Sequence, residues 1–133
     1  MLFVTCFSAA ILALLLVLLT VLTIIARGRF KVILSDNGEQ ALLKFIRAHG
    51  NLAEFAPIFL ILLGLVELNH FLSGFWLWLT AIVFIAGRFI HATSLLFIEP
   101  KTLKFRVVGM GMTFIPLIKL SLLLIVKMIM SLF

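Results

Sequence analysis

An all-helical membrane protein, built as a bundle of four spanning helices, is the fold that the sequence predicts. Of its 133 residues, 65% are hydrophobic and only 12% are charged, and the mean hydropathy is +1.35. Such a composition is typical of an integral membrane protein. A spanning helix needs about 20 mostly apolar residues, and four such stretches fill the chain with short connections. We therefore expect one transmembrane domain over residues 1–133.

The first predicted helix covers residues 2–26. Its apolar run is longer than the core of a signal peptide, which is about 7–15 residues, so we interpret it as a retained transmembrane helix. Arg27, Arg29 and Lys31 follow directly and should stop transfer of the chain across the membrane. Cys6 is the only cysteine, which excludes an intrachain disulfide and favours a packing role for this side chain.

The second predicted helix covers residues 39–66 and is preceded by a helix-start signal. Asp36 with Glu39, or Asn37 with Gln40, has the spacing of a capping box. The first half of this segment is amphipathic and the second half is wholly apolar. We expect the first half to be lined partly by protein and partly by water.

The third and fourth predicted helices cover residues 75–96 and 106–130. Trp76 and Trp78 begin the third helix and indicate an aromatic anchor at the membrane interface. Between the two helices, a loop is expected. The fourth helix contains Gly109 and Gly111. We expect these glycines to permit close packing between helices and not to bind a ligand.

Basic residues predict how the chain is oriented in the membrane. The first connection and its flank hold Arg27, Arg29, Lys31, Lys44 and Arg47, and the third connection holds Lys101, Lys104 and Arg106. The second connection holds none. The positive-inside rule then places both termini outside the cytoplasm. Because the net charge of +6 is explained by helix ends, no nucleic-acid partner is expected, and motifs for metal binding are absent from the sequence.

A polar stripe runs along the start of the second predicted helix. On a helix its members fall within a sector of roughly 80°. The stripe consists of Gln40, Lys44, Arg47, Asn51 and Glu54. His49 lies on roughly the opposite side. Polar groups inside a bilayer are costly and usually have a function, so we interpret the stripe as the wall of a site.

Two buried charges are predicted to lie at the same depth. Glu54 and Arg88 both fall about 20 Å from the outer face when counted along antiparallel neighbouring helices. They have opposite sign, and each alone is costly in lipid. We therefore expect Glu54 and Arg88 to form an ion pair or to share a ligand. His91 follows Arg88 by three residues and shares its helix face.

The segment Arg47-Ala-His-Gly-Asn51-Leu-Ala-Glu54-Phe-Ala-Pro57, followed by Ala86-Gly-Arg88-Phe-Ile-His91, resembles the MAPEG family. These are the membrane-associated proteins of eicosanoid and glutathione metabolism, and they include microsomal glutathione transferases and leukotriene C synthase. The later Arg106-Val-Val-Gly109-Met resembles the bacterial branch, which implies a bacterial inner membrane.

The resemblance implies a four-helix protomer that forms a homotrimer, with glutathione as a substrate bound between neighbouring subunits near the cytoplasmic side. Matching positions one by one gives two sets of site residues. The implied glutathione-binding residues are Arg47, His49, Asn51, Glu54, Arg88 and His91. The implied catalytic residues are Arg27 and Arg88, with Arg106 or Lys104 as a further basic group. No metal is implied.

Glutathione conjugation needs a thiolate, and an adjacent cation lowers the pKa of a thiol. A cluster of arginines could hold the two carboxylates of glutathione and favour the thiolate. Glu54 could accept the ammonium group of the tripeptide. The apolar helix surfaces would dissolve a small lipophilic electrophile from the lipid bilayer. The predicted function is therefore a glutathione transferase or peroxidase.

Other interpretations of the same residues stay open. The polar stripe could be a structural lock between helices, and His91 could be a hydrogen-bonding helix residue. The chain contains no tyrosine, and Phe55 and His91 stand where characterised transferases often carry one. This favours a non-enzymatic trimer that binds a thiol peptide or a lipid. Intramembrane charges also mark permeation paths, so a small transporter or channel subunit is a third possibility.

Overall fold

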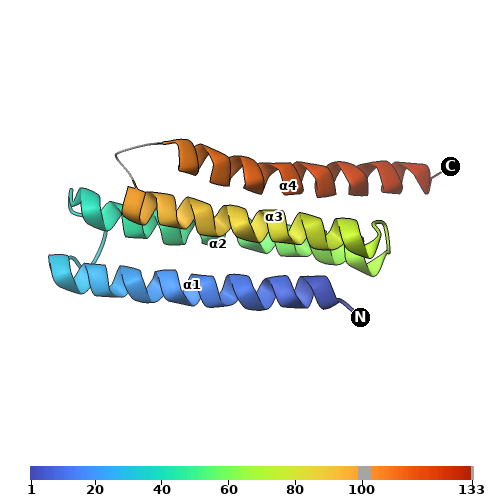
Figure 1. Ribbon diagram of the computed structural model, residues 1–133. Helices are drawn as coiled ribbons and strands as arrows, with labels where there is room; N and C mark the ends of the chain where they lie inside the picture. Colours follow the sequence, from blue (N-terminus) through green and yellow to red (C-terminus); the bar gives the residue numbers. More distant parts are fainter. Residues whose placement is uncertain (99–102, 133) are drawn as a thin grey trace.

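The computed structural model describes residues 1–98 and 103–132 and shows four long helices (Figure 1). They are α1 (Phe3–Phe30), α2 (Gln40–Leu68), α3 (Gly74–Thr93) and α4 (Lys104–Met130), and a short π-helix, η1 (Ser94–Ile98), continues α3. No strand occurs within the residues that the structure describes. The predicted all-helical fold is confirmed.

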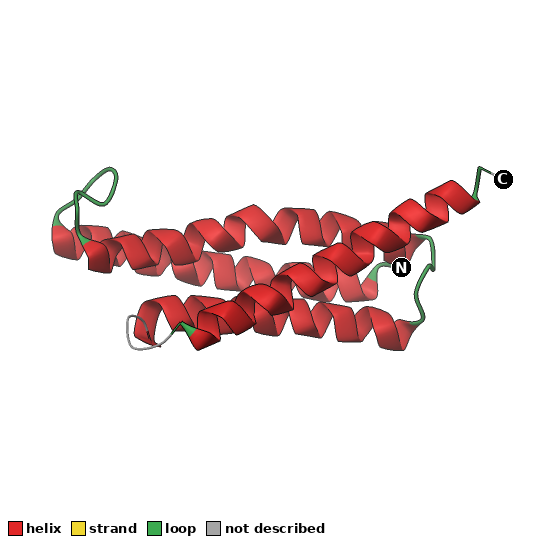
Figure 2. Cartoon of the chain, turned by 90° about the horizontal axis from the view of Figure 1, so that it is seen from above, coloured by secondary structure: helices red, strands yellow, loops and turns green. Residues whose placement is uncertain are grey.

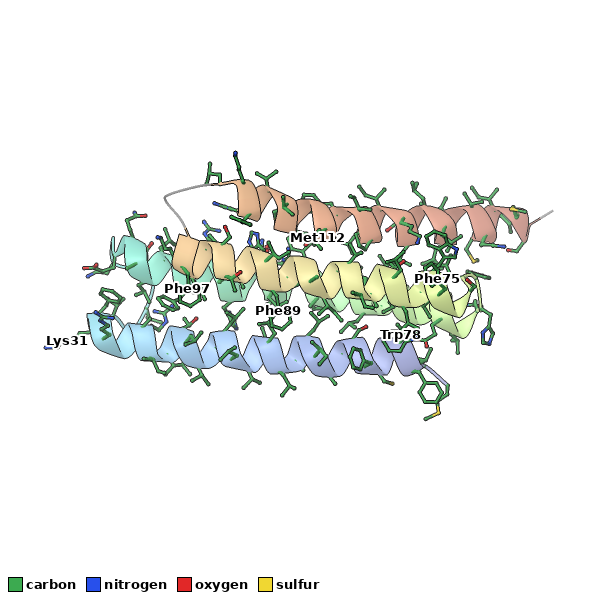
Figure 3. All side chains as sticks on the ribbon, in the orientation of Figure 1. Lys31, Phe75, Trp78, Phe89, Phe97 and Met112 are labelled. Atoms are coloured by element: carbon green, nitrogen blue, oxygen red, sulfur yellow. The ribbon has the colours of Figure 1, made fainter. Side chains whose placement is uncertain are left out.

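Each of the four helical stretches is long and apolar enough to cross a membrane. Large apolar side chains project outward along the bundle (Figure 3). Phe75 and Phe97, for example, are 70% and 75% exposed. Exposed apolar groups along the full length of a bundle suit contact with lipid tails instead of water. The helices therefore form a four-helix membrane bundle, as the composition predicted.

Helix ends depart from the predicted boundaries where the backbone finds local partners. α1 continues past the predicted end, to Phe30. It ends there because Lys31 adopts a left-handed conformation, with φ 55°, and Val32 N–H donates back to the carbonyl of Arg27 at 3.1 Å. α4 begins at Lys104, inside the predicted loop. Residues 99–102, which include Lys101, lie outside the described residues.

The predicted capping box before α2 is wrong. Glu39 occupies the N-cap position and makes no side-chain capping hydrogen bond. The Asp36 carboxylate instead accepts the N–H of Gly38 at 3.2 Å, which closes a local turn. Because Asn37 and Gly38 both have positive φ, the chain turns between Asp36 and the helix, so the carboxylate does not reach the helix terminus.

The bundle is arranged around a central pair of helices. α2 and α3 lie in the middle, with α1 and α4 on opposite flanks (Figures 1 and 2). α1 packs mainly on α2, and α4 packs mainly on α3. In the core, Phe59 of α2 stacks on Phe84 of α3 with ring centroids 3.7 Å apart. This arrangement leaves the polar stripe of α2 to face the end of α3 and the start of α4.

α3 and α4 approach each other closely at two glycines. A Cβ added to Gly87 would lie 2.7 Å from Met112 Cβ, and one added to Gly109 would lie 2.8 Å from the backbone nitrogen of His91. Both distances are shorter than real Cβ contacts, so only glycine fits. The predicted packing role of Gly109 is confirmed. A Cβ on Gly111 would meet nothing within 4 Å, so Gly111 has no such role within this chain.

Glu67, near the end of α2, binds the start of α1. Its carboxylate accepts hydrogen bonds from Val4 N–H at 2.9 Å, from Thr5 N–H at 2.8 Å and from the Thr5 hydroxyl at 2.7 Å. The first N–H groups of a helix have no partner within that helix. A carboxylate is a strong acceptor for them and also favours the positive end of the helix dipole. Glu67 therefore caps α1 from another helix.

Lys119, a cation well inside α4, is satisfied within the chain. Its Nζ donates to the hydroxyl of Thr80 at 2.9 Å and lies 5.1 Å from the centre of the Trp76 ring. The Thr80 hydroxyl in turn donates to the carbonyl of Trp76. These contacts join α4 to α3 and stabilise the ammonium group by a hydrogen bond and a cation–π interaction.

Candidate functional site

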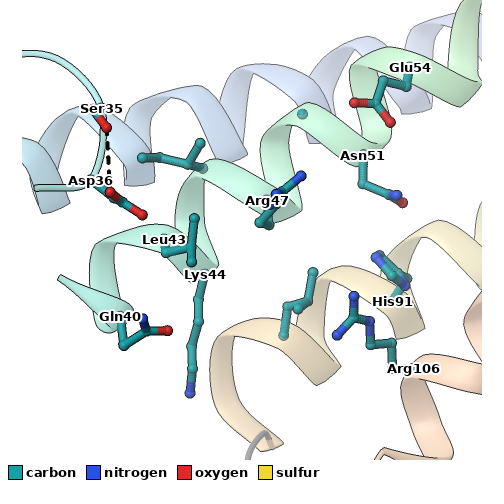
Figure 4. Close-up of a pocket in the computed structure, with 13 residues that line it drawn as sticks. Ser35, Asp36, Gln40, Leu43, Lys44, Arg47, Asn51, Glu54, His91 and Arg106 are labelled. Atoms are coloured by element: carbon teal, nitrogen blue, oxygen red, sulfur yellow. Dashed lines mark hydrogen bonds between the residues drawn. The ribbon is translucent and has the colours of Figure 1, made fainter. Parts of the chain in front are cut away.

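A polar pocket opens at the end of the bundle where α2 begins and α3 ends (Figure 4). Its volume is about 810 Å³, which is within the range of small-molecule sites. All five members of the polar stripe line it, as do His91 of α3 and Arg106 of α4. The stripe therefore forms one wall of a pocket, as the helical spacing predicted.

The charged side chains in this pocket are of both signs. The cations are Lys44, Arg47 and Arg106, and the anions are Asp36 and Glu54. Arg47 and Glu54 lie one turn either side of Asn51 on α2, and both are exposed on the protomer. A pocket with three cations and two carboxylates is complementary to a ligand that carries both carboxylate and ammonium groups.

Arg88 lies behind the pocket wall and does not line it. Its side chain is 2% exposed. One terminal nitrogen, Nη1, donates to Asn51 Oδ1 at 2.6 Å, and the other, Nη2, donates to the Thr113 hydroxyl. The rings of Phe55 and Phe84 lie 5.5 and 5.8 Å from the guanidinium carbon, so the cation is also stabilised by aromatic faces.

The predicted direct ion pair between Glu54 and Arg88 is not formed among the described residues. Arg88 lies close to the level that its position in the chain predicts, because its guanidinium reaches Asn51, one helical turn from Glu54. Asn51 occupies the position between them. Its amide oxygen takes the arginine, so Glu54 is left exposed at the pocket surface.

Besides Arg88, two further expected site residues do not line the pocket of their own protomer. Arg27 donates through Nη1 to the carbonyls of Ile33 and Ser35, at 3.1 and 2.9 Å. It therefore organises the α1–α2 connection. His49 is half-buried on α2 and does not line the pocket, in agreement with its predicted position opposite the stripe.

His91 is brought into the pocket from α3. It is 3% exposed, and its ring lies between Asn51 and Arg106 in Figure 4. Its Nδ1 is buried and has no hydrogen-bond partner among the described residues. The same holds for the Ser94 hydroxyl at the start of η1. Buried polar atoms are usually satisfied, so this end of α3 differs from the rest of the core.

Sequence reasoning missed two residues of this region. The sequence predicts a capping role for Asp36, but Asp36 lines the pocket. Thr113 was not singled out, yet it is fully buried and accepts from Arg88. Its only sequence signal is a hydroxyl within an apolar helix one turn after Gly109, whose carbonyl accepts the Thr113 hydroxyl at 2.9 Å. Clusters of three or more His, Cys, Asp or Glu that could hold a metal do not occur in the described part of the chain.

Four membrane-length helices define an integral membrane protein, and this one has a charged pocket at one end of the bundle. The model of the MAPEG family matches residues 5–126. The chain therefore belongs to the MAPEG family, which includes glutathione transferases and peroxidases as well as other members. A comparison with curated proteins gave no match.

Proposed function

We propose that this protein is a glutathione-dependent membrane enzyme, a transferase or peroxidase that acts on a lipophilic electrophile. The observation that carries the proposal is the pocket itself. It combines three cations with two carboxylates in a chain of the MAPEG family. Glutathione has two carboxylates, an ammonium group and a thiol, so its charges match those of the pocket.

The three cations of the pocket and Glu54 each have a role in this proposal. Arg47 and Arg106 bind the carboxylates of glutathione, because a guanidinium can donate to both oxygens of one carboxylate. Glu54 accepts the ammonium group. The remaining positive charge stabilises the thiolate. In conjugation, the thiol proton passes to solvent, the sulfur forms a bond to the electrophilic carbon, and the leaving group departs with the electrons of its bond. Positioning and thiolate stabilisation supply the catalysis.

The proposed assembly is a homotrimer in which each site lies between two subunits. Arg27 and His49 do not line the pocket of their own protomer, while the pocket residues Arg47 and Glu54 are exposed on its flank. In the trimer, the neighbouring subunit contributes Arg27 and His49 to this pocket. The basic residues of the connections support an orientation in which the pocket end of the bundle lies at the cytoplasmic face and both termini lie outside. The proposed membrane is the bacterial inner membrane.

The absence of tyrosine favours a second function, a membrane trimer that binds a thiol peptide or lipid without turning it over. Phe55 has no hydroxyl to offer, and its ring packs edge-on against Phe114 with centroids 5.7 Å apart. Turnover in detergent would support the enzyme. Binding without turnover would support the second function, and flux in proteoliposomes would point to transport.

Calorimetric titration of glutathione into detergent-purified protein tests the site. The wild-type protein is expected to bind, and Arg47→Ala should lose binding because it removes a pocket cation. Arg29→Ala is the matched control, since Arg29 is exposed and outside the pocket. Equal binding by all three proteins would contradict the site assignment. Conjugation of a chromogenic aryl halide then distinguishes the transferase from a binding protein.

Mixed trimers test whether subunits share a site. Arg27→Ala and Arg47→Ala subunits, co-expressed in equal amounts, each carry one intact half of the shared site. In a cyclic trimer with head-to-tail interfaces, every mixed trimer has one junction where both halves are intact, so about a quarter of wild-type sites should return. Sites built within one protomer would give no recovery, because every protomer carries one of the two substitutions.

A further inference from the structure

The Asn51 side chain is held in one orientation by the residue behind it. Arg88 has only hydrogen-bond donors in its side chain, and it directs Nη1 at Asn51 Oδ1 over 2.6 Å. A second, longer contact joins the same nitrogen to the backbone carbonyl of Asn51 at 3.5 Å. A flipped amide would place its NH₂ group against the guanidinium donors and lose this charge-assisted hydrogen bond. The oxygen of Asn51 must therefore point inward.

Arg88 is itself fixed from several sides, so it cannot follow a flipped amide. Nη2 donates to the Thr113 hydroxyl, which is an acceptor at that point because its proton is donated to the Gly109 carbonyl at 2.9 Å. The rings of Phe55 and Phe84 confine the guanidinium. The hydrogen bonds thus all run in one direction, from the donors of Arg88 to acceptors on Asn51, Thr113 and Met110.

The orientation of the amide decides what Asn51 offers to a ligand. Asn51 lines the pocket and is half-buried. No described residue accepts a hydrogen bond from its Nδ2, and Nδ2 is not among the buried atoms without a partner. With the oxygen engaged on the inner side, the two N–H donors face the pocket.

We propose that Arg88 is a positioning residue that fixes the Asn51 amide so that it presents N–H donors, and no acceptor, to a carboxylate or carbonyl oxygen of the ligand. Arg88 does this without lining the pocket. The identity of the ligand as glutathione rests on the proposed function. The role of Arg88 in orienting Asn51 does not.

Asn51→Asp is the decisive variant. The aspartate has the same shape and keeps an oxygen for Arg88, so the fold should be retained and the inner contact becomes an ion pair. The oxygen facing the pocket, however, now accepts and carries charge. Glutathione affinity measured by calorimetry should fall about ten- to hundredfold, the range for a lost hydrogen bond to a charged group. Unchanged affinity in a folded Asn51→Asp protein would overturn the proposal and leave Asn51 with a structural role alone.

Asparagine side-chain NMR tests the same inference without any ligand. The chain has three asparagines, Asn37, Asn51 and Asn69, so protein labelled with ¹⁵N-asparagine gives three NH₂ pairs, and Asn51→Asp identifies one by deleting it. Arg88→Met removes the donors and should shift that pair alone. Arg88→Lys restores a donor and should bring the pair back toward its wild-type position. If the Asn51 pair is the same in Arg88→Met and the wild type, Arg88 does not position the amide.

The two experiments separate the inference from the function on which part of it rests. A wild-type protein that binds no glutathione would refute the proposed function, while the NMR shifts would still decide whether Arg88 orients Asn51. If Arg88→Met does not fold, Asn51→Asp carries the test. A ten- to hundredfold fall in glutathione affinity then supports the proposal, and unchanged affinity in a folded protein overturns it.

Discussion

The close contact of α3 and α4 predicts opposite effects for two alanine substitutions in α4. In Gly109→Ala, the new Cβ would lie 2.8 Å from the nitrogen of His91 and 2.9 Å from the carbonyl oxygen of Gly87. Ordinary contact begins at 3.4 Å, and the atoms that it meets are backbone atoms, which cannot rotate away. α4 must therefore move back from α3, and the layers of the core separate with it.

The change in the free energy of unfolding has two opposing contributions. Overpacking in a close-packed core costs about 1–3 kcal/mol, and replacing glycine by alanine in a helix gains about 1 kcal/mol. Gly109→Ala should therefore lower the free energy of unfolding by up to about 2 kcal/mol. Gly111→Ala is the matched control: its Cβ meets nothing within 4 Å, so it should be neutral or stabilising by up to about 1 kcal/mol.

Unfolding in mixed micelles, titrated with a denaturing detergent and followed by tryptophan fluorescence, measures both variants. Because α4 also carries Arg106 into the pocket, Gly109→Ala should weaken ligand binding as well, whereas Gly111→Ala should not. A Gly109→Ala protein as stable as Gly111→Ala would refute the claim that backbone contact sets the distance between the two helices.

Two further predictions concern polar contacts within the bundle. Glu67→Gln removes the charge that accepts three hydrogen bonds at the start of α1, so it should reduce the free energy of unfolding by about 1–3 kcal/mol. Glu39→Gln is the control, because Glu39 is exposed and makes no side-chain capping bond. It should have no measurable effect in the same detergent titration. Thr80→Val leaves the Lys119 ammonium without its hydrogen-bond acceptor and should destabilise the protein by about 1–3 kcal/mol. Lys119→Met removes the charge altogether and should be neutral or stabilising. A Thr80→Val protein as stable as the wild type would contradict the role of this contact.

The helices and the pocket wall were predictable because both depend on local periodicity. Hydropathy alone identifies four spanning stretches, and the angle between residues on one helix places Gln40, Arg47 and Glu54 on one face wherever that helix packs. A site wall supplied by a single helix is therefore visible in the sequence. The start of α2 was also predicted within a residue, although the capping box expected there does not form.

The contacts between helices were not predictable in the same way. Charge and depth suggested Glu54 as the partner of Arg88, but the choice of Asn51 and Thr113 depends on how the helices rotate and slide against one another. The sequence gives no signal for the contact of Glu67 with Thr5. This contact depends on how far α1 and α2 are shifted along each other's axes. Specific partners across an interface follow from the tertiary packing, and polarity alone only indicates that a partner is needed.

The contact between Glu67 and the start of α1 also bears on how the protein is made. During synthesis α1 emerges first, and the carboxylate that caps it is added only when almost all of α2 has been translated. Until then, the N–H groups of Val4 and Thr5 need another hydrogen-bond partner, such as water. The start of α1 is therefore capped only in the presence of the end of α2, so the two helices depend on each other as a hairpin. α3 and α4 follow in the chain and supply His91 and Arg106 to the pocket.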